Sequence, residues 1–353
     1  MSPDHAAEGA GSRPGNRRAA LVLVVLTPVI AELTWGLIPL SMAWLVLPLV
    51  PVYGAGILLI REVVRRTGRG WPSIVLLGVA YELVEDGIGL QALSSPTLYG
   101  AAEWGPRVLG LNVPYWEANV VYHVLFSAVI PVLVTELLFP AHRHAPFLKK
   151  AGLASTAVVA VAGVGVLRLA IPPSMDPGYV APPPVVLGCV IAVAVLAVVA
   201  LRIVPPRSVR QPTATRPPPR WAMGPLGAVG AFVLLGLVFP IRASGQPAFT
   251  EGNWVIVSML ATVALVTAII LVIRHWARSA TWSDRHALLL AGGAVIGHTV
   301  FGAFSMADTD VDRYGLLGVA VLLVVLIGFL DRRIAQRSLG APDLHLSAVD
   351  PQR

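Results

Sequence analysis

The sequence has few charged residues for its length. Only 13% of its 353 residues are Asp, Glu, Lys or Arg, whereas 56% are hydrophobic. Soluble chains carry about 25% charged residues, so this chain has too little charge to cover a soluble globule of its size. The scarcity of charge excludes a soluble enzyme and indicates a polytopic membrane protein that resides in the lipid bilayer.

Cysteine and the common cofactor motifs are also lacking. The single cysteine, Cys189, lies in the apolar run 185–204, so a disulfide framework or a thiolate metal site is excluded. A small core residue in a helix is its simplest interpretation. Walker A, G-x-G-x-x-G, H-E-x-x-H and DDxxD-like sequences are absent. Nucleotide coupling, zincin chemistry and diphosphate ionisation by acidic motifs therefore lack support.

Long apolar segments are abundant instead. A helix needs about 20 apolar residues to cross roughly 30 Å of hydrocarbon. The segments that meet or nearly meet this length are 19–37, 42–61, 72–92, 115–139, 151–171, 184–204, 222–241, 254–273, 287–304 and 315–330. We predict an all-α fold, a polytopic transmembrane helix bundle of about ten spans.

The basic residues give an independent test of this topology. Short cytoplasmic loops of membrane proteins collect Lys and Arg. With ten spans and the N-terminus inside, 22 of the 26 basic residues fall on the cytoplasmic side. We therefore predict a multi-pass protein of the cell membrane with both termini cytoplasmic. The net charge of +7 is then explained by the basic residues of the cytoplasmic loops, and no nucleic-acid partner is expected.

The amino-acid composition changes along the chain. We predict six regions: a disordered cytoplasmic tail at 1–18, a polar and aromatic four-span half at 19–140, an Ala/Val-rich two-span segment at 141–204, a Pro/Arg-rich cytoplasmic linker at 205–221, a four-span C-terminal half at 222–330 and a cytoplasmic tail at 331–353. The Pro/Arg-rich stretch has three interpretations, which are a flexible linker, a contact with anionic lipid or a partner site. The oligomeric state stays open.

The third span carries the densest acidic group at membrane depth. Glu82 lies three residues before Glu85 and four before Asp86, so the carboxylates can share one helix face. Like-charged neighbours at that depth cannot all stay ionised cheaply. At least one should hold a proton, pair with a base or bind a cation.

Other polar residues are expected in the same leaflet. They are Glu32, Glu117, Asn119, His123, Arg168 and His298. Hydration or snorkelling would explain Glu117 and Arg168, and a single intramembrane histidine can simply be a hydrogen-bonded core residue. Glu62 and Glu136, beside the basic loops, are expected to form structural ion pairs.

Aromatic residues accompany these acids. Trp35, Tyr53, Tyr81, Trp116 and Tyr122 are expected mostly near the outer side, where an interfacial belt explains them. The alternative is an aromatic-walled pocket that opens outward and is capped by the loop 93–114.

Two resemblances bear on the chain. The stretch with Arg61-Glu62, Arg65-Arg66, Gly70-Trp71-Pro72-Ser73 and Tyr81-Glu82-Leu83-Val84-Glu85-Asp86-Gly87 resembles an uncharacterised group of bacterial polytopic membrane proteins. It covers residues 20–140 and implies topology without an activity.

The second resemblance is to CPBP-type intramembrane proteases, through Glu85-Asp86, His123 and His298. Here the second acid is Asp and the expected arginine is missing, with Gly89 and Leu90 nearby. His298 also follows His123 by 175 residues, which is long for a compact core.

Three functions remain open. In an intramembrane enzyme acting on a lipophilic or isoprenoid-like substrate, the catalytic residues would be drawn from Glu82, Glu85, Asp86, His123 and His298. A divalent metal ion, if one takes part, would be held by Glu85, His123 and His298. The substrate contacts would be Glu32, Trp35, Tyr81, Trp116, Asn119, Tyr122 and Arg168.

In a secondary transporter for a small molecule, the same carboxylates would form the proton or cation site, and Arg168 could bind an anionic substrate. In a non-catalytic membrane component, the charges would be buried structural pairs. Whether the first, third, fourth and ninth spans surround one cavity would decide between them.

Overall fold

The structure is a computed structural model that describes residues 15–208, 211–240 and 254–339. The described chain is a bundle of helices. The only strands in the described ranges form one hairpin, in which β1 (Arg107–Val108) pairs antiparallel with β2 (Leu111–Asn112). The predicted all-α class is confirmed.

The first four predicted spans contain most of the irregular helix. The segments are α1 (Arg17–Pro28) with η1 (Val29–Leu33); η2 (Leu40–Leu45), α2 (Val46–Leu49), η3 (Val50–Gly54) and α3 (Ala55–Arg66); α4 (Trp71–Glu82) with η4 (Leu83–Gly89); and α5 (Val113–Tyr122), η6 (His123–Val129) and α6 (Ile130–Leu138). Short 3-10 turns, η5 (Leu98–Glu103) and η7 (Pro140–His142), lie in the loops.

The remaining spans are more regular. They are α7 (Lys150–Met175), α8 (Pro183–Val198) with η8 (Val199–Ile203), α9 (Arg220–Val238), α10 (Val255–Trp276), α11 (Asp284–Ser305) and α12 (Asp310–Leu339). Eight helical segments of the described chain are long and apolar enough to cross a membrane. The two predicted spans outside that group are the 17 residues of α1–η1 and α4–η4, which contains three acidic residues.

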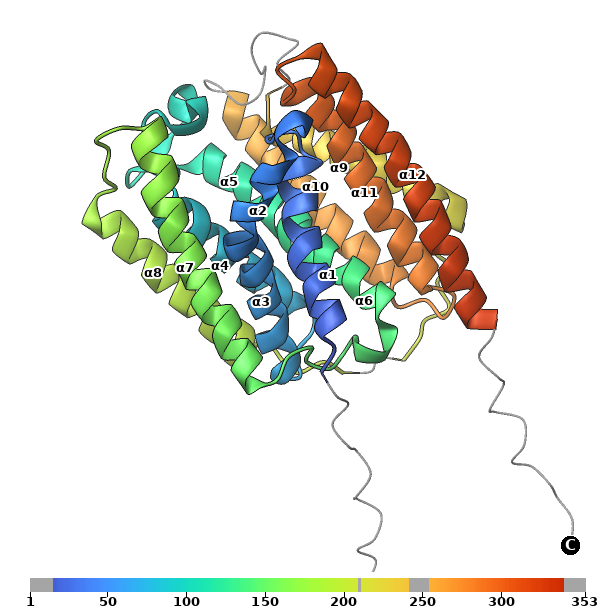
Figure 1. The fold of residues 1–353 in the computed structure, drawn as a ribbon. Coiled ribbons are helices and arrows are strands. Elements are labelled where there is room, and N and C mark those ends of the chain that lie inside the picture. Colours follow the sequence, from blue (N-terminus) through green and yellow to red (C-terminus); the bar gives the residue numbers. More distant parts are fainter. Residues whose placement is uncertain (1–14, 209–210, 241–253, 340–353) are drawn as a thin grey trace, which may run out of the picture.

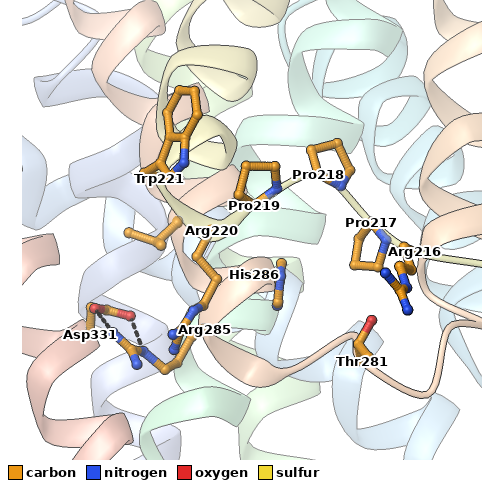
Figure 2. Close-up of a pocket in the computed structure, with 11 residues that line it drawn as sticks. Arg216, Pro217, Pro218, Pro219, Arg220, Trp221, Thr281, Arg285, His286 and Asp331 are labelled. Carbon is orange, nitrogen blue, oxygen red and sulfur yellow. Dashed lines mark hydrogen bonds and ion pairs between the residues drawn. The ribbon is translucent and has the colours of Figure 1, made fainter.

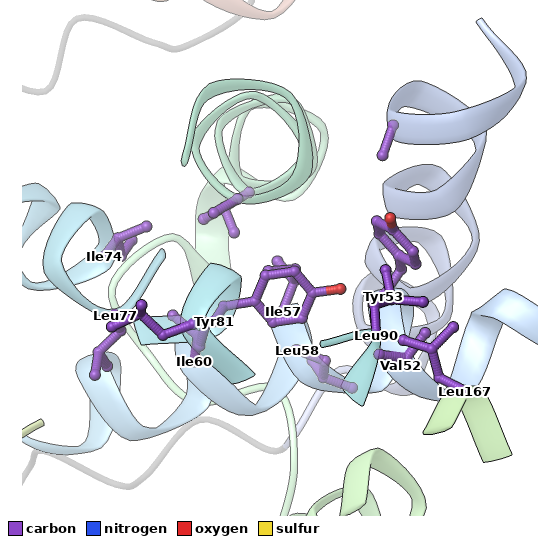
Figure 3. Close-up of a cluster of buried hydrophobic side chains, with 14 of the residues drawn as sticks. Val52, Tyr53, Ile57, Leu58, Ile60, Ile74, Leu77, Tyr81, Leu90 and Leu167 are labelled. Atoms are coloured by element: carbon purple, nitrogen blue, oxygen red, sulfur yellow. The ribbon is translucent and has the colours of Figure 1, made fainter. Parts of the chain in front are cut away.

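The helices form two flanks around a central layer (Figure 1). Helices α7 and α8 cover α3 and α4 on one flank, α9, α11 and α12 form the other, and α1, α5 and α6 lie between. A large apolar cluster fills the first flank, and the rings of Tyr53 and Tyr81 belong to it (Figure 3). The exposed faces of α7, α8, α10 and α12 are rich in Val, Leu and Ile, as contact with lipid requires.

Glycine allows the second flank to pack tightly. A Cβ atom on Gly293 of α11 would lie 2.0 Å from the carbonyl oxygen of Gly224 in α9. At Gly297 it would lie 2.1 Å from the carbonyl oxygen of Ala228. Small residues let membrane helices approach closely where no hydrophobic effect drives them together. These glycines let α11, which carries His298, pack directly against α9.

The basic loops meet at one end of the bundle. Arg61 is fully buried there; its Nη1 donates to Glu62 (2.9 Å) and its Nε to Glu136 (3.2 Å). Arg65 donates to both oxygens of Glu136, each at 2.8 Å. The Arg61 guanidinium also covers the ring of Phe147 at 3.3 Å. The structural ion pairs expected of Glu62 and Glu136 are confirmed.

The structure describes parts of the predicted tails and of the linker. Residues 1–14 of the predicted N-terminal tail lie outside the described residues, and α1 already begins at Arg17. Helix α12 continues to Leu339, into the predicted C-terminal tail. In the linker, the amide of Arg207 donates to Gly68 and that of Thr213 to Arg278. These two hydrogen bonds connect the described parts of 205–221 to neighbouring loops.

Candidate functional site

π-Helical turns interrupt the inner helices where the polar side chains gather. Five of the described helical segments are π-helical. Four of them carry Glu32 (η1), Tyr53 (η3), Glu85 with Asp86 (η4) and His123 (η6). A π turn inserts one extra residue in the helix and re-aims the side chains around it, and such turns are frequent at functional sites. Sequence periodicity does not reveal them.

The acidic group of the third span is buried as a unit. Glu82, Glu85 and Asp86 are each at most 2% exposed. Oε2 of Glu82 accepts a hydrogen bond from Nε1 of Trp116 at 3.0 Å. By contrast, Oε1 of Glu82, Oε2 of Glu85 and Oδ2 of Asp86 are buried without a hydrogen-bond partner. Each carboxyl group thus keeps one oxygen that the protein leaves unsatisfied.

His123 is the basic group nearest these acids. Its Nδ1 lies 3.6 Å from Oε2 of Glu85, beyond hydrogen-bonding distance, and 3.1 Å from Oγ of Ser127. Its ring lies 5.9 Å from that of Tyr81 and 5.3 Å from that of Tyr122, both measured between centroids. The imidazole is therefore enclosed by aromatic rings with one edge turned toward Glu85.

Tyr53 joins Glu32 to the same group. Its hydroxyl group lies beside the carboxyl groups of both Glu32 and Glu85. Its ring centroid is 6.0 Å from those of Tyr81 and His123. The acid cluster, which we define as Glu32, Glu82, Glu85 and Asp86, therefore spans η1 and α4–η4, with Tyr53 between them.

The acid cluster lacks cationic partners. Among the described residues, no Arg or Lys forms an ion pair with any of its four carboxyl groups, and His123 is the only basic residue in such contact. Burying an ionised carboxylate without a counter-charge is expensive. Four buried acids facing one imidazole cannot all be ionised together.

His298 belongs to a separate aromatic cluster. Its ring stacks between Phe126 at 4.1 Å and Trp35 at 4.8 Å, measured between centroids. Its Nε2 lies 3.3 Å from the Tyr122 hydroxyl and its Nδ1 3.4 Å from that of Thr34. Both ring nitrogens thus have partners, as in a satisfied core histidine.

The residues suggested for a metal ion do not converge. Within the described chain, no three His, Cys, Asp or Glu side chains are arranged to hold a metal ion. Tyr122 separates the two histidines: its ring lies 5.3 Å from that of His123 and 5.6 Å from that of His298, between centroids. The structure brings Glu85 and His123 together without His298.

The other predicted contacts divide in the same way. Tyr81 and Trp116 border the acid cluster, whereas Trp35 packs with His298. Asn119 donates to the carbonyl of Tyr115, one turn earlier in its own helix, at 2.9 Å.

Arg168 is only partly buried and donates to the carbonyl of Ile88 at 3.4 Å. It supports the end of η4 and makes no ion pair with a described acid.

The loop 93–114 is tied to the end of the third span. The amide of Asn112 donates to the carbonyl of Leu93 at 2.8 Å, which ties the hairpin to the end of the third span. Arg107 donates to the carbonyls of Ser94 and Ser95. These bonds hold the hairpin against the residues that follow η4.

The comparisons with known proteins agree with this architecture. A model of an uncharacterized membrane protein family matches residues 21–330. The chain belongs to this family. No curated protein and no solved structure matches the chain. The likeness to CPBP-type proteases receives no support from the family match.

The family assignment confirms a multi-pass membrane protein and extends beyond the stretch 20–140 that carried the resemblance. The matched residues include most of every described helix. The buried acids therefore have to be interpreted within a membrane-spanning bundle.

Proposed function

We propose that the protein is a proton-coupled secondary carrier in which the acid cluster is the proton-binding site. The observation that carries this proposal is the burial of four carboxyl groups with His123 as their only basic contact among the described residues. Bound protons would neutralise these carboxyl groups and so lower the free-energy cost of burying them inside a membrane. Glu85 is the central acid because it faces both Tyr53 and His123.

The closed state of the cluster favours a carrier over an intramembrane enzyme. An enzyme acting on a lipophilic substrate needs its acid open to the lipid or to a substrate cavity. Here Glu82, Glu85 and Asp86 are all shielded from solvent and from the lipid-facing surface. A carrier passes through such an occluded state, with its ion site sealed, during each cycle of alternating access.

The surroundings of the cluster favour a neutral or cationic organic substrate. Acidic groups lined by Tyr53, Tyr81 and Trp116 attract a cation both by charge and through the faces of aromatic rings. Arg168, the candidate for an anionic substrate, is engaged with Ile88 instead. Exchange of a proton for such a cation keeps the buried charge constant.

We further propose ten spans with both termini on the cytoplasmic side of the cell membrane. The start of α1 and the end of α12 lie at the same end of the bundle (Figure 1). Contacts at that end join loops far apart in sequence, such as Arg143 with Asp284 and Arg69 with the carbonyl of Arg202. The gathering of basic loops at one end supports a cytoplasmic assignment for it.

Proteoliposomes loaded with a pH-sensitive dye test the carrier proposal. Gradients of small organic cations such as ethidium and tetraethylammonium, and of neutral solutes, would be imposed in turn. We expect at least one probe to drive proton movement in the opposite direction, and Glu85→Gln to abolish it. Glu117→Gln, the same chemical change on a half-buried acid outside the cluster, should retain it. Equal proton movement in Glu85→Gln contradicts the proposal.

A further inference from the structure

A basic pocket lies at the end of the bundle where the basic loops meet, away from the acid cluster. It has a volume of about 590 Å³. Its walls are the segment Arg216–Arg220, the start of α11 at Arg285 and His286, and Asp331 near the end of α12 (Figure 2). Neither the acid cluster nor its proposed proton chemistry involves these residues.

The charges in this pocket are not balanced. Arg285 is committed to Asp331, with Nε 2.6 Å from Oδ1 and a second hydrogen bond from Nη2 to Oδ2. Arg216 and Arg220 form no hydrogen bond or ion pair through their side chains with any described residue. The pocket therefore carries two uncompensated positive charges.

The backbone holds these two arginines in place. Pro217, Pro218 and Pro219 separate them, and successive prolines adopt an extended, stiff conformation. Upstream, Thr213 exchanges backbone hydrogen bonds with the loop that contains Ala280. The backbone that carries the two arginines is therefore ordered before a ligand binds.

The pocket also has an exposed tryptophan in its wall. Trp221 follows Arg220 at the start of α9 and is 78% exposed. Tryptophan is enriched where membrane helices meet the lipid headgroups. A ligand with its anionic part between Arg216 and Arg220 would extend its apolar part past Trp221 along α9.

We infer that this pocket binds the phosphate group of an anionic phospholipid. Basic pockets between spans on the cytoplasmic side suit such headgroups, and arginine matches phosphate oxygens through paired N–H donors. Asp331 opposes the ligand by its own charge and by occupying Arg285. Arg216 and Arg220 are therefore the residues that recognise the phosphate.

Native mass spectrometry of the full-length protein in a neutral detergent tests this inference. Phosphatidylglycerol, phosphatidylcholine and inorganic phosphate would each be titrated separately. We expect retention of phosphatidylglycerol over phosphatidylcholine. Arg216→Gln combined with Arg220→Gln should weaken phosphatidylglycerol binding about thirtyfold. Both side chains are exposed, so these replacements should preserve the fold.

Two further variants make the result specific. Lys149→Gln with Lys150→Gln removes the same charge from exposed positions at the same end and should leave binding unchanged. Asp331→Asn removes the opposing charge and should strengthen binding about fivefold. The inference is overturned if the lysine pair weakens binding as much as the arginine pair, or if neither does. If the protein binds inorganic phosphate but not phosphatidylglycerol, the ligand of the pocket is free phosphate and the inference of a lipid is overturned.

Discussion

Oε2 of Glu85 and Nδ1 of His123 face each other at 3.6 Å in the middle of a membrane-spanning bundle, without a hydrogen bond between them. The same nitrogen has Ser127 as its partner at 3.1 Å. The acid and the base are thus held close enough to exchange a proton after a small movement, and far enough apart to stay neutral.

This relationship predicts different effects for the two residues. Glu85→Gln removes the proton-carrying group, so proton-coupled uptake in proteoliposomes should disappear. His123→Gln should reduce uptake by about 10²-fold without uncoupling it, because a positioned acid–base partner typically contributes on the order of 10²–10⁴-fold to a proton transfer. If both variants lose proton-coupled uptake to the same extent, the proton is shared by Glu85 and His123 and is not carried by Glu85 alone.

The hydrogen bond between Trp116 and Glu82 is predicted to stabilise the fold. Trp116→Phe keeps an aromatic side chain but leaves both oxygens of Glu82 without a donor, which costs about 1–3 kcal/mol of unfolding free energy. Denaturant unfolding in detergent measures this cost. The same replacement in a Glu82→Leu background should cost much less. Trp254→Phe, on an exposed residue, is the control.

Sequence reasoning predicted a shared depth for these residues but could not predict their direction around the helix axis. Topology placed His298 in the same leaflet as Glu85, yet its nitrogens contact Tyr122 and Thr34 in another cluster. Helix rotation depends on packing between spans, here on the close approach of α11 to α9 at Gly293 and Gly297. A single sequence does not encode that approach in any local pattern.

Tyr53 was missed as a site residue for a related reason. It was grouped with an interfacial aromatic belt, but the π turn η3 directs it toward Glu32 and Glu85. By contrast, the ion pairs of Glu62 and Glu136 were predictable, because acids beside a run of arginines at a membrane boundary have few other partners. The ten helical segments followed directly from the apolar runs.

The close contact between Gly87 and Cys189 gives a packing prediction. A Cβ atom at Gly87 would lie 2.7 Å from Sγ of Cys189, so Gly87→Ala should destabilise the protein by about 1–3 kcal/mol. Cys189→Ala should relieve the clash, and the double variant should recover most of the loss. Gly188→Ala is the control, since nothing lies within 4 Å of its Cβ position. Additive effects in the thermal unfolding of the double variant would exclude this contact as the cause.

The buried ion pairs at the basic end predict a larger effect. Glu136→Gln leaves the buried Arg61 and Arg65 with too little negative charge, and removing one partner of such a pair costs about 3–5 kcal/mol. The exposed pair of Arg313 and Asp310 is the control, and Asp310→Asn should cost less than about 1 kcal/mol. Unfolding in detergent compares the two directly. Similar small losses would mean that water screens the Arg61 and Arg65 charges.

The central claim is that the acid cluster holds exchangeable protons at neutral pH. Infrared spectroscopy of the purified protein measures this through the carbonyl stretch of protonated carboxylic acids. We predict such a band at pH 7, a decrease in Glu85→Gln, Glu82→Gln and Asp86→Asn but not in Glu117→Gln, and a downward shift after transfer to D₂O. A spectrum without this band, or a band that D₂O leaves unchanged, would contradict a proton site that communicates with solvent.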